Sequence, residues 1–463
     1  MKLRALKRSV MIALQVAILL LVSSASLLAQ GKNPLILIPG LSGSELVDKK
    51  TGEKIWFRAV KSKSEDLRLP ISTDISSAKD NVVPGDVLRN VKIGPVTVTD
   101  IYGGFIRAME MRGGYREENW DSPSEDGDHD SLYVFPYDWR LDNVANAQRL
   151  FSAVEALKKK LKKPDLKFDI VAHSLGGIIS RYAVMYGDAE LPAGSKKLTP
   201  TWAGAKHFDK VILLGTPNEG SANSLSALLN GYTIGGFRID LPFLEDTSRF
   251  TVFTIPSAYQ LLPAPGTLRL LNDKLDPIEG DLYDTKVWSK YGWNPVEDKG
   301  FADKFDESER KIASQFFAGQ LARAKRLHEA LAASRGKSGG VTFQVFGSDC
   351  KVAVNSVVLY RDRDTDSWKT VFRPKGFTRA DGTKVSDGEL KDAMTTPGDG
   401  VVSTRSLEAM TQSESAGVRS IMDSGAPKYV CEEHSKLAAN SRIQDQIIKF
   451  LDTKTAIVDQ KDK

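Results

Sequence analysis

Residues 166–186 hold the feature that most restricts the fold of this chain, a strand joined directly to a helix by a sharp turn. The pattern predicts a buried strand over residues 166–172 and the helix that it feeds over residues 175–186. Between them lies Ala172-His173-Ser174-Leu175-Gly176-Gly177, with small residues two positions either side of the serine. Such small residues let a strand and a helix pass close together at one strained turn.

Further strands and helices alternate along the chain. The apolar run at residues 35–38 is too short for a helix, is bounded by proline and glycine, and is typical of a buried parallel strand. Strand patterns recur at residues 132–135, 208–214 and 341–346, and apolar residues recur at helical spacing over residues 147–161 and 443–451. This alternation predicts an α/β fold, a mostly parallel sheet flanked by helices.

Two long segments depart from the alternating pattern. Residues 45–130 are predicted to be irregular, apart from a helix near residues 102–111. Residues 221–340 contain an apolar, glycine-containing stretch, then polar loops, and end in an amphipathic helix expected over residues 308–333. We therefore predict one domain over residues 30–463 with insertions at about 45–130 and 221–340, of which the second is a cap or lid by its position.

The first 29 residues are typical of a secretory signal peptide. Basic residues precede an apolar run at residues 11–22, and small residues then lead to Ala25 and Ala29, which are the candidate cleavage sites. The apolar run is short for a bilayer span and Gln15 interrupts it, which favours a cleaved signal over an uncleaved anchor. We predict an exported protein, periplasmic or secreted.

Charge and cysteine content restrict the partners and the redox chemistry. The formal net charge is +5, but Lys2, Arg4, Lys7 and Arg8 supply most of it, so the mature chain is nearly neutral and no nucleic-acid partner is expected. Export would allow the two cysteines, Cys350 and Cys431, to form a disulfide. Two unpaired buried thiols are the alternative, because spacing in the sequence does not give the distance between sulfurs.

The turn at Ser174 has the context of a nucleophile elbow, in which the serine hydroxyl projects above the edge of the sheet. Serine is a weak nucleophile at neutral pH, so a histidine base and an acid that orients it are required. Among the five histidines, His434 alone follows the last predicted sheet segment, which matches the chain order serine, acid, histidine of this kind of site. The other four are interpreted as surface or structural residues: His129, His173 (expected to point elsewhere on the turn), His207 and His328.

Two aspartates fit the role of the acid on pattern alone. Asp349 directly follows a predicted strand, and Asp399 lies in the turn Pro397-Gly398-Asp399-Gly400. The backbone amides of Leu41, in the loop after the first strand, and of Leu175, at the start of a helix, are predicted to stabilise an oxyanion. An ordinary turn without a catalytic role is the alternative for each loop, and neither a cofactor nor a metal site is predicted.

Together these motifs resemble the lecithin:cholesterol acyltransferase family, which includes lysosomal phospholipase A2 and phospholipid:diacylglycerol acyltransferases. The matching segments span most of the mature chain: Ile38-Pro39-Gly40-Leu41-Ser42-Gly43-Ser44, Tyr137-Asp138-Trp139-Arg140, Ala172 to Gly177, Gly215-Thr216-Pro217 with Gly220 and Ser221, and Gly398-Asp399-Gly400 with Val402. The resemblance implies an α/β-hydrolase fold and a triad of Ser174, Asp399 and His434, so it favours Asp399 over Asp349. It also implies the oxyanion donors Leu41 and Leu175.

The resemblance further implies a serine-dependent acyltransferase or phospholipase that acts on phospholipids or other acyl lipids. A lipid alcohol or water would accept the acyl group, and contact with a membrane surface would be transient. The segment after Gly220 would be a mobile lid, whose apolar residues suit either acyl-chain contact or the core of a buried cap: Leu225, Leu228, Leu229, Tyr232, Ile234, Phe237 and Leu241.

The family's cysteine-bridged membrane-contact loop is missing from the early insertion of this chain, where Trp56 and Phe57 are expected to take its place.

Two alternative functions stay open. One alternative function is a secreted lipase or carboxylesterase without transferase activity, because the same triad serves water and alcohol acceptors. The other is a non-catalytic binding protein on a hydrolase scaffold, which the presence of all three triad candidates disfavours.

Overall fold

The computed structural model describes residues 31–57, 67–74, 79–93, 96–194, 196, 198–232, 247–333, 339–409 and 426–453. The predicted signal peptide, residues 1–29, lies outside these residues and stays a prediction. Among the helices within the described ranges, none combines the length and the apolar character that crossing a membrane would need.

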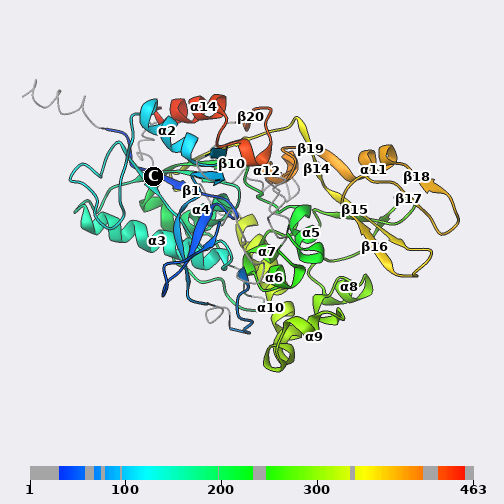
Figure 1. Ribbon diagram of the computed structural model, residues 1–463. Helices are drawn as coiled ribbons and strands as arrows, with labels where there is room; N and C mark the ends of the chain where they lie inside the picture. The colour runs from blue at the N-terminus through cyan, green and yellow to red at the C-terminus, as the bar shows by residue number, and fades with distance from the viewer. Residues whose placement is uncertain are drawn as a thin grey trace, which may run out of the picture.

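A seven-stranded sheet forms the centre of the molecule (Figure 1). Every neighbouring pair of its strands is parallel, in the order β20-β13-β10-β9-β1-β8-β7. The strands are β1 (Leu35–Ile38), β7 (Arg116–Glu117), β8 (Ser131–Val134), β9 (Phe168–His173), β10 (Phe208–Leu214), β13 (Thr342–Gly347) and β20 (Lys428–Tyr429). All four residues of β1 are buried, as expected for a parallel strand covered on both faces. The predicted parallel sheet is confirmed.

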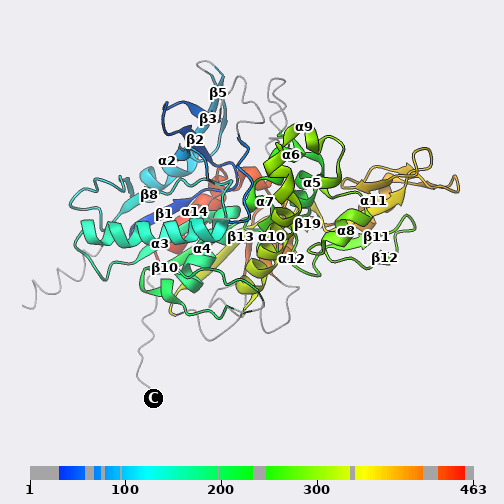
Figure 2. The same ribbon diagram turned by 90° about the horizontal axis from the view of Figure 1, so that it is seen from below.

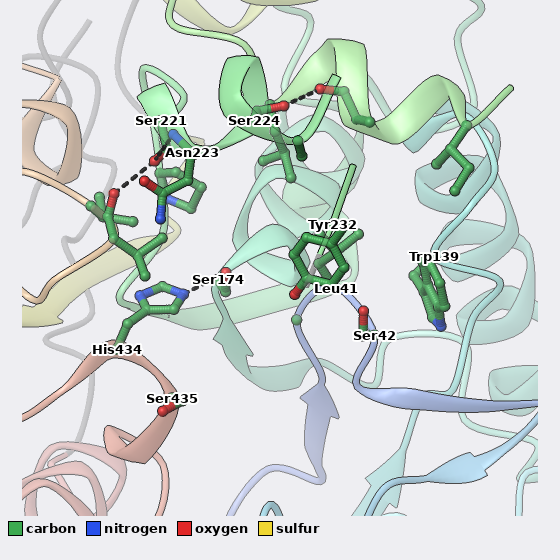
Figure 3. Close-up of a pocket in the computed structure, with 18 of the residues that line it drawn as sticks. Leu41, Ser42, Trp139, Ser174, Ser221, Asn223, Ser224, Tyr232, His434 and Ser435 are labelled. Atoms are coloured by element: carbon green, nitrogen blue, oxygen red, sulfur yellow. Dashed lines mark hydrogen bonds between the residues drawn. The ribbon is translucent and has the colours of Figure 1, made fainter. Parts of the chain in front are cut away.

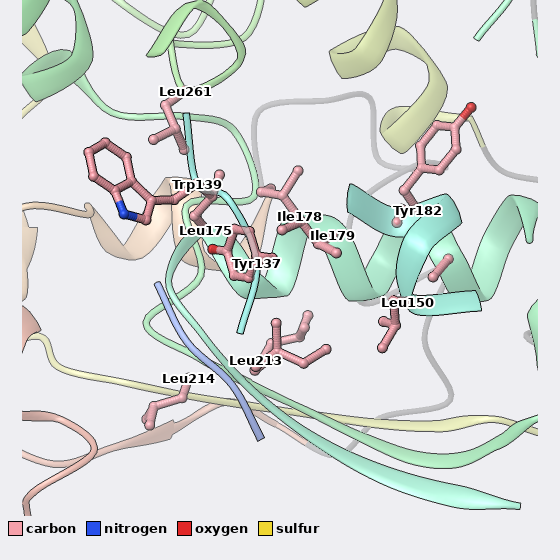
Figure 4. Close-up of a cluster of buried hydrophobic side chains, with 14 of the residues drawn as sticks. Tyr137, Trp139, Leu150, Leu175, Ile178, Ile179, Tyr182, Leu213, Leu214 and Leu261 are labelled. Atoms are coloured by element: carbon pink, nitrogen blue, oxygen red, sulfur yellow. The ribbon is translucent and has the colours of Figure 1, made fainter. Parts of the chain in front are cut away.

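Helices cover both faces of this sheet. Figures 1 and 2 show α3 (Asn143–Lys160) and α4 (Leu175–Tyr186) on one face, and α2 (Gly103–Met111) and α14 (Ser441–Leu451) on the other. All twelve residues of α4 are buried. Ile178 and Ile179 of α4 and Leu213 of β10 lie in one buried cluster (Figure 4), and full burial of such a side chain contributes roughly 1.5–3 kcal/mol. This packing holds the beginning of α4 firmly against the sheet.

The strand order places the loops after β1 and β9 side by side. Strand β1 lies between β8 and β9, although the chain visits β8 first and reaches β9 only after crossing to the other side of β1. The carboxyl ends of β1 and β9 therefore meet at a topological switch point, where open α/β sheets place their ligand sites. Ser174 directly follows β9.

The first insertion contains more strand than its sequence predicts. Strands β2 (Ser44–Asp48), β3 (Lys54–Trp56) and β4 (Val82–Val87) form an antiparallel sheet, and β5 (Asn90–Ile93) and β6 (Val96–Asp100) form a hairpin. The prediction of an irregular segment was wrong here because β4 contains Pro84 and Gly85, which normally argue against a strand. Proline is tolerated because β4 is an edge strand of its sheet.

The second insertion is mainly helical and reaches Ser174. Its elements are α5 (Ala222–Asn230), α6 (Arg249–Phe253), α7 (Pro256–Gln260), β11 (Arg269–Leu271), β12 (Pro277–Ile278), α8 (Thr285–Lys290), η4 (Pro295–Glu297), α9 (Phe301–Lys304) and α10 (Glu307–Ala332). Helix α10 begins at a capping box in which Asp306 and Glu309 satisfy each other's backbone amides. It ends within one residue of the prediction.

A small second sheet lies to one side of the main sheet (Figure 1). Strand β11 of the second insertion pairs in parallel with β15 (Ser356–Arg361), which follows the last long strand of the main sheet, and β16 (Trp368–Val371) completes the hairpin around Asp364. A second hairpin, β17 (Phe377–Thr378) with β18 (Lys384–Val385), surrounds Asp381. Both hairpins belong to sheets that are separate from the main one.

Candidate active site

Ser174 occupies a strained turn between β9 and α4. Its backbone has φ +52° and ψ −122°, a region that residues with a side chain rarely adopt. Its N–H donates to the carbonyl of Leu214 at 2.8 Å, which ties the turn to β10. The glycines that follow are needed for space, because a Cβ on Gly176 would lie 2.6 Å from the Pro39 carbonyl oxygen and one on Gly177 would lie 1.9 Å from Thr216 Oγ1.

The structure brings the three predicted triad side chains into one hydrogen-bonded line. His434 Nε2 lies 2.9 Å from Ser174 Oγ, and His434 Nδ1 lies 2.7 Å from Asp399 Oδ2. Figure 3 shows the His434 ring pointing at Ser174 from a separate loop. The backbone N–H of His434 also donates to the carbonyl oxygen of Asp399 at 2.9 Å. Histidine and acid are therefore held together by main chain and side chain.

Asp399 is held as a carboxylate by its surroundings. Its Oδ1 accepts the backbone N–H groups of Val401 at 3.0 Å and Val402 at 2.7 Å, and the residue is 3% exposed. Burial opposes ionisation, but His434 and the two amides outweigh it, so the pKa of Asp399 lies below its usual value. A buried carboxylate of this kind fixes the tautomer of the histidine that it faces.

The two candidate acids occupy different surroundings. Asp349 is exposed in the loop after β13, whereas Asp399 directly follows β19 (Thr395–Gly398), which pairs with β14 (Lys351–Val354). Cys350 and Cys431 form a disulfide, with the sulfurs 2.11 Å apart. Because Cys431 lies three residues before His434, this bond fastens the histidine loop to the segment that leads into β14.

The other four histidines lie in four different surroundings. His129 pairs with Asp128 at 2.8 Å, His207 lies 3.2 Å from the Lys158 ammonium, and His328 is buried on α10. His173 does not point elsewhere, as the sequence suggested: its Nε2 lies 3.1 Å from the carbonyl oxygen of His434, and the two ring centroids are 5.2 Å apart. Nothing in the sequence around His173 signals this contact.

Two motif residues brace the loop after β1. The Tyr137 hydroxyl donates to the carbonyl oxygen of Pro39 at 2.9 Å, and Trp139 Nε1 donates to the carbonyl oxygen of Ser44 at 3.2 Å. The backbone N–H of Tyr137 also donates to Ser44 Oγ at 3.1 Å. Tyr137 and Trp139 of the Tyr137-Asp138-Trp139-Arg140 motif therefore have a structural role beside the site.

Trp56 braces the loop after β1 and does not face a membrane surface. It is 1% exposed, and its Nε1 donates to the carbonyl oxygen of Ser42 at 3.0 Å. The expectation that Trp56 contacts a membrane surface was wrong, because an aromatic side chain in an irregular sequence gives no sign of whether it is buried. Leu41, a predicted oxyanion donor, lies in the cavity wall beside Gly40 and Ser42. Leu175, the other predicted donor, is the first residue of α4, so its backbone N–H has no acceptor within the helix.

A cavity opens directly over Ser174 and His434 (Figure 3). Helices α5 to α7 and the loops after β1 and β19 form its walls, which are mostly apolar. The apolar or aromatic lining residues include Leu41, Trp56, Trp139, Ala227, Tyr232, Val252, Ile255, Ala258, Leu261, Val401 and Val402.

The predicted lid residues fall into four groups. Leu225 and Leu228 are fully buried in the main hydrophobic core, whereas Tyr232 lines the cavity. Leu229 packs against the core while remaining partly exposed. The remaining three, Ile234, Phe237 and Leu241, lie outside the described residues.

The parallel sheet and the strained serine at its switch point define the class of this protein, the α/β hydrolases. The crystal structure of the Tle4–Tli4 complex aligns with 90% of this chain and 98% of that chain, with 13% sequence identity and a TM-score of 0.50, and supports the fold alone. Residues 128–313 match the family model described as Lecithin:cholesterol acyltransferase, which confirms the resemblance of the motifs to this family.

A curated relative is known from yeast. The uncharacterized protein YJR098C of Saccharomyces cerevisiae is 24% identical over 265 residues, which are 56% of this chain and 34% of the yeast protein. The chain thus spans about a third of the length of the relative that it matches.

Proposed function

We propose that this protein is a serine-dependent acyltransferase or phospholipase that acts on acyl lipids through an acyl-enzyme intermediate. The observation that carries the proposal is the continuous line from Asp399 through His434 to Ser174 at the base of an apolar cavity. The family match supports an ester hydrolase or acyltransferase chemistry.

In the first half of the reaction, Ser174 Oγ attacks the carbonyl carbon of the acyl ester. His434 Nε2 takes the hydroxyl proton, and the backbone amides of Leu41 and Leu175 stabilise the oxyanion of the tetrahedral intermediate. The bond to the leaving alcohol then breaks, and the His434 imidazolium gives that oxygen its proton. Asp399 stays ionised throughout, because its charge stabilises the imidazolium.

In the second half, water or a lipid alcohol attacks the acyl group on Ser174. His434 removes the proton of the attacking hydroxyl and returns a proton to Ser174 Oγ as the acyl–serine bond breaks. Water yields a free fatty acid, and an alcohol yields a new ester. The same three residues therefore serve hydrolysis and transfer.

The walls of the cavity support an acyl lipid as the substrate. Apolar side chains from α5 to α7 surround Ser174, and burial of an alkyl chain against them contributes about 0.8 kcal/mol per methylene group. An esterase for small polar esters would not need such a lining. A binding protein without catalysis is disfavoured because Ser174, His434 and Asp399 are all present and hydrogen-bonded.

Export to the periplasm or the medium belongs to the same proposal. The predicted signal peptide supports it, and so does the disulfide between Cys350 and Cys431, since disulfides persist mainly in oxidising compartments. Lipid substrates outside the cytoplasm lie in membranes, so we propose a transient contact with a membrane surface during each turnover.

Product analysis tests this proposal. The purified mature chain is incubated with acyl-labelled phosphatidylcholine, with and without a long-chain alcohol, and the products are separated by mass spectrometry. We expect labelled fatty acid in both samples and labelled alkyl ester only with the alcohol, and neither with the Ser174→Ala variant. Fatty acid without ester would leave a lipase, and equal product from Ser174→Ala would contradict the mechanism.

A further inference from the structure

Two buried side chains outside the triad connect its loops. Tyr102 is the N-cap residue directly before α2, in the first insertion, and His173 is the last residue of β9. Tyr102 is 2% exposed and His173 is 4% exposed. We propose that Tyr102 and His173 form a positioning pair that fixes the main chain of His434 relative to the loop after β1; this inference rests on the proposed serine mechanism.

The hydrogen-bond partners determine the direction of each bond. His173 Nε2 lies 3.1 Å from the carbonyl oxygen of His434, which only accepts, so Nε2 carries the proton. Nδ1 of the neutral ring is then an acceptor, and the Tyr102 hydroxyl at 2.7 Å must donate to it. The same hydroxyl oxygen accepts the backbone N–H of Gly40 at 2.8 Å. The bridge is therefore complete from Gly40 to His434, with one tautomer allowed.

The bridge holds the loop after β1 and the histidine loop at once. The main chain of His434 is fixed on both sides, because its N–H donates to Asp399 and its carbonyl accepts from His173. Gly40, at the other end, packs so closely that an added Cβ would lie 2.9 Å from Ser174 Cβ. The bridge thus sets the position of His434 Nε2 relative to Ser174 Oγ, from two residues that also line the cavity.

His173 must stay neutral for this role. Burial lowers the pKa of His173 to about 3, and the neighbouring His434 ring contributes in the same direction. When His434 becomes an imidazolium during the reaction, a neutral neighbour adds no repulsion. The donor to the His434 carbonyl is therefore retained throughout the catalytic cycle.

Paired variants separate positioning from stability. Tyr102→Phe removes the hydroxyl, and His173→Gln keeps a donor close to the place of Nε2, whereas His173→Leu keeps none. Tyr133→Phe is the matched control, because Tyr133 of β8 is fully buried and its hydroxyl donates to the carbonyl oxygen of Gly127, in the loop before β8, at 2.9 Å. Hydrolysis of a chromogenic ester is measured for each, together with the melting temperature and with Ser174→Ala as the reference for the proposed chemistry.

We expect kcat of Tyr102→Phe to fall about tenfold with KM unchanged, the cost of one lost buried hydrogen bond in the transition state. His173→Leu should lose more than Tyr102→Phe, and His173→Gln should recover part of that loss. Tyr133→Phe should lower the melting temperature but leave kcat within about twofold of the wild type. Equal kcat values for Tyr102→Phe and the wild type, or equal losses for Tyr102→Phe and Tyr133→Phe, would overturn the proposal.

A measurement that needs no activity completes the test. The protein is labelled with ¹⁵N-histidine, and the NMR signal of His173 is assigned as the one that the His173→Gln variant lacks. In the wild type this signal should show a protonated Nε2 and an unprotonated Nδ1, unchanged from pH 7 to about pH 4. The opposite tautomer, or ordinary titration near pH 6.5, contradicts the bridge even if every ester assay fails. Absence of wild-type activity with the expected tautomer would instead reject the proposed function alone.

Discussion

The Asp399→Asn variant removes the charge beside His434 while keeping the shape of the side chain. In the wild type, Oδ1 accepts two backbone amides, from Val401 and Val402, and Oδ2 faces Nδ1 of His434 at 2.7 Å. The amide oxygen of asparagine must face the two backbone N–H groups, because its NH₂ group there would oppose two donors. The NH₂ group then points at His434.

That orientation reverses the tautomer of the base. Nδ1 of His434 has to accept from the asparagine NH₂ group, so the proton moves to Nε2, which faces Ser174 Oγ. A protonated Nε2 cannot take the serine proton, and the imidazolium loses its counter-charge. We expect kcat to fall about 10³–10⁴-fold, which corresponds to roughly 4–5.5 kcal/mol of transition-state stabilisation.

The assay is the initial rate of ester hydrolysis, with the melting temperature as a check on folding. The matched control is Asp349→Asn, the other acid that the sequence allows, which is exposed in the loop after β13. This variant should keep at least about half of the wild-type kcat, as expected for a surface substitution. A loss below tenfold for Asp399→Asn, or a larger loss for Asp349→Asn, would refute the assignment of the acid.

Three further predictions concern the loops and the core. Gly40→Ala should lower kcat of ester hydrolysis about 100-fold, because its Cβ would lie 2.9 Å from Ser174 Cβ and must displace the loop; an unchanged kcat would show that the loop yields. Replacing Cys350 and Cys431 by serine should cost about 2–4 kcal/mol of unfolding free energy in urea and lower activity, since the histidine loop loses its tether; equal urea midpoints would contradict this. Burial lowers the pKa of His328 to about 4, so the unfolded state binds the extra proton and stability falls from pH 6.5 to 4. Thermal melts of His328→Leu should show a shallower fall, and an identical slope would count against it.

Long periodic segments could be predicted well from the sequence. Helix α4 and strand β10 have the predicted ends, because the apolar pattern and the flanking glycines agree there. Short strands could not be predicted: β11 has three residues and pairs with β15 from a distant part of the chain. Three residues are too few to identify the strand with which they pair, so the sheet that contains β11 and β15 could not be predicted.

The candidate site, like the fold, could be predicted only in part from the sequence. Ser174 and His434 could be proposed as nucleophile and base from the sequence, because the elbow has a local pattern and the chain order leaves one candidate base. The acid stayed open between Asp349 and Asp399 until the family resemblance favoured Asp399, because the pairing of β14 with β19 depends on tertiary contacts. The contact of His173 with His434 could not be found at all, since it joins a side chain to a backbone carbonyl far along the chain.

Covalent trapping tests the central claim most directly. The mature protein is treated with a fluorophosphonate that carries an alkyl chain, digested, and analysed by mass spectrometry. We predict a single adduct on the peptide that contains Ser174, no adduct in Ser174→Ala, and labelling at least about 100-fold slower in His434→Ala. An adduct that persists in Ser174→Ala, or equal labelling rates with and without His434, would contradict the account.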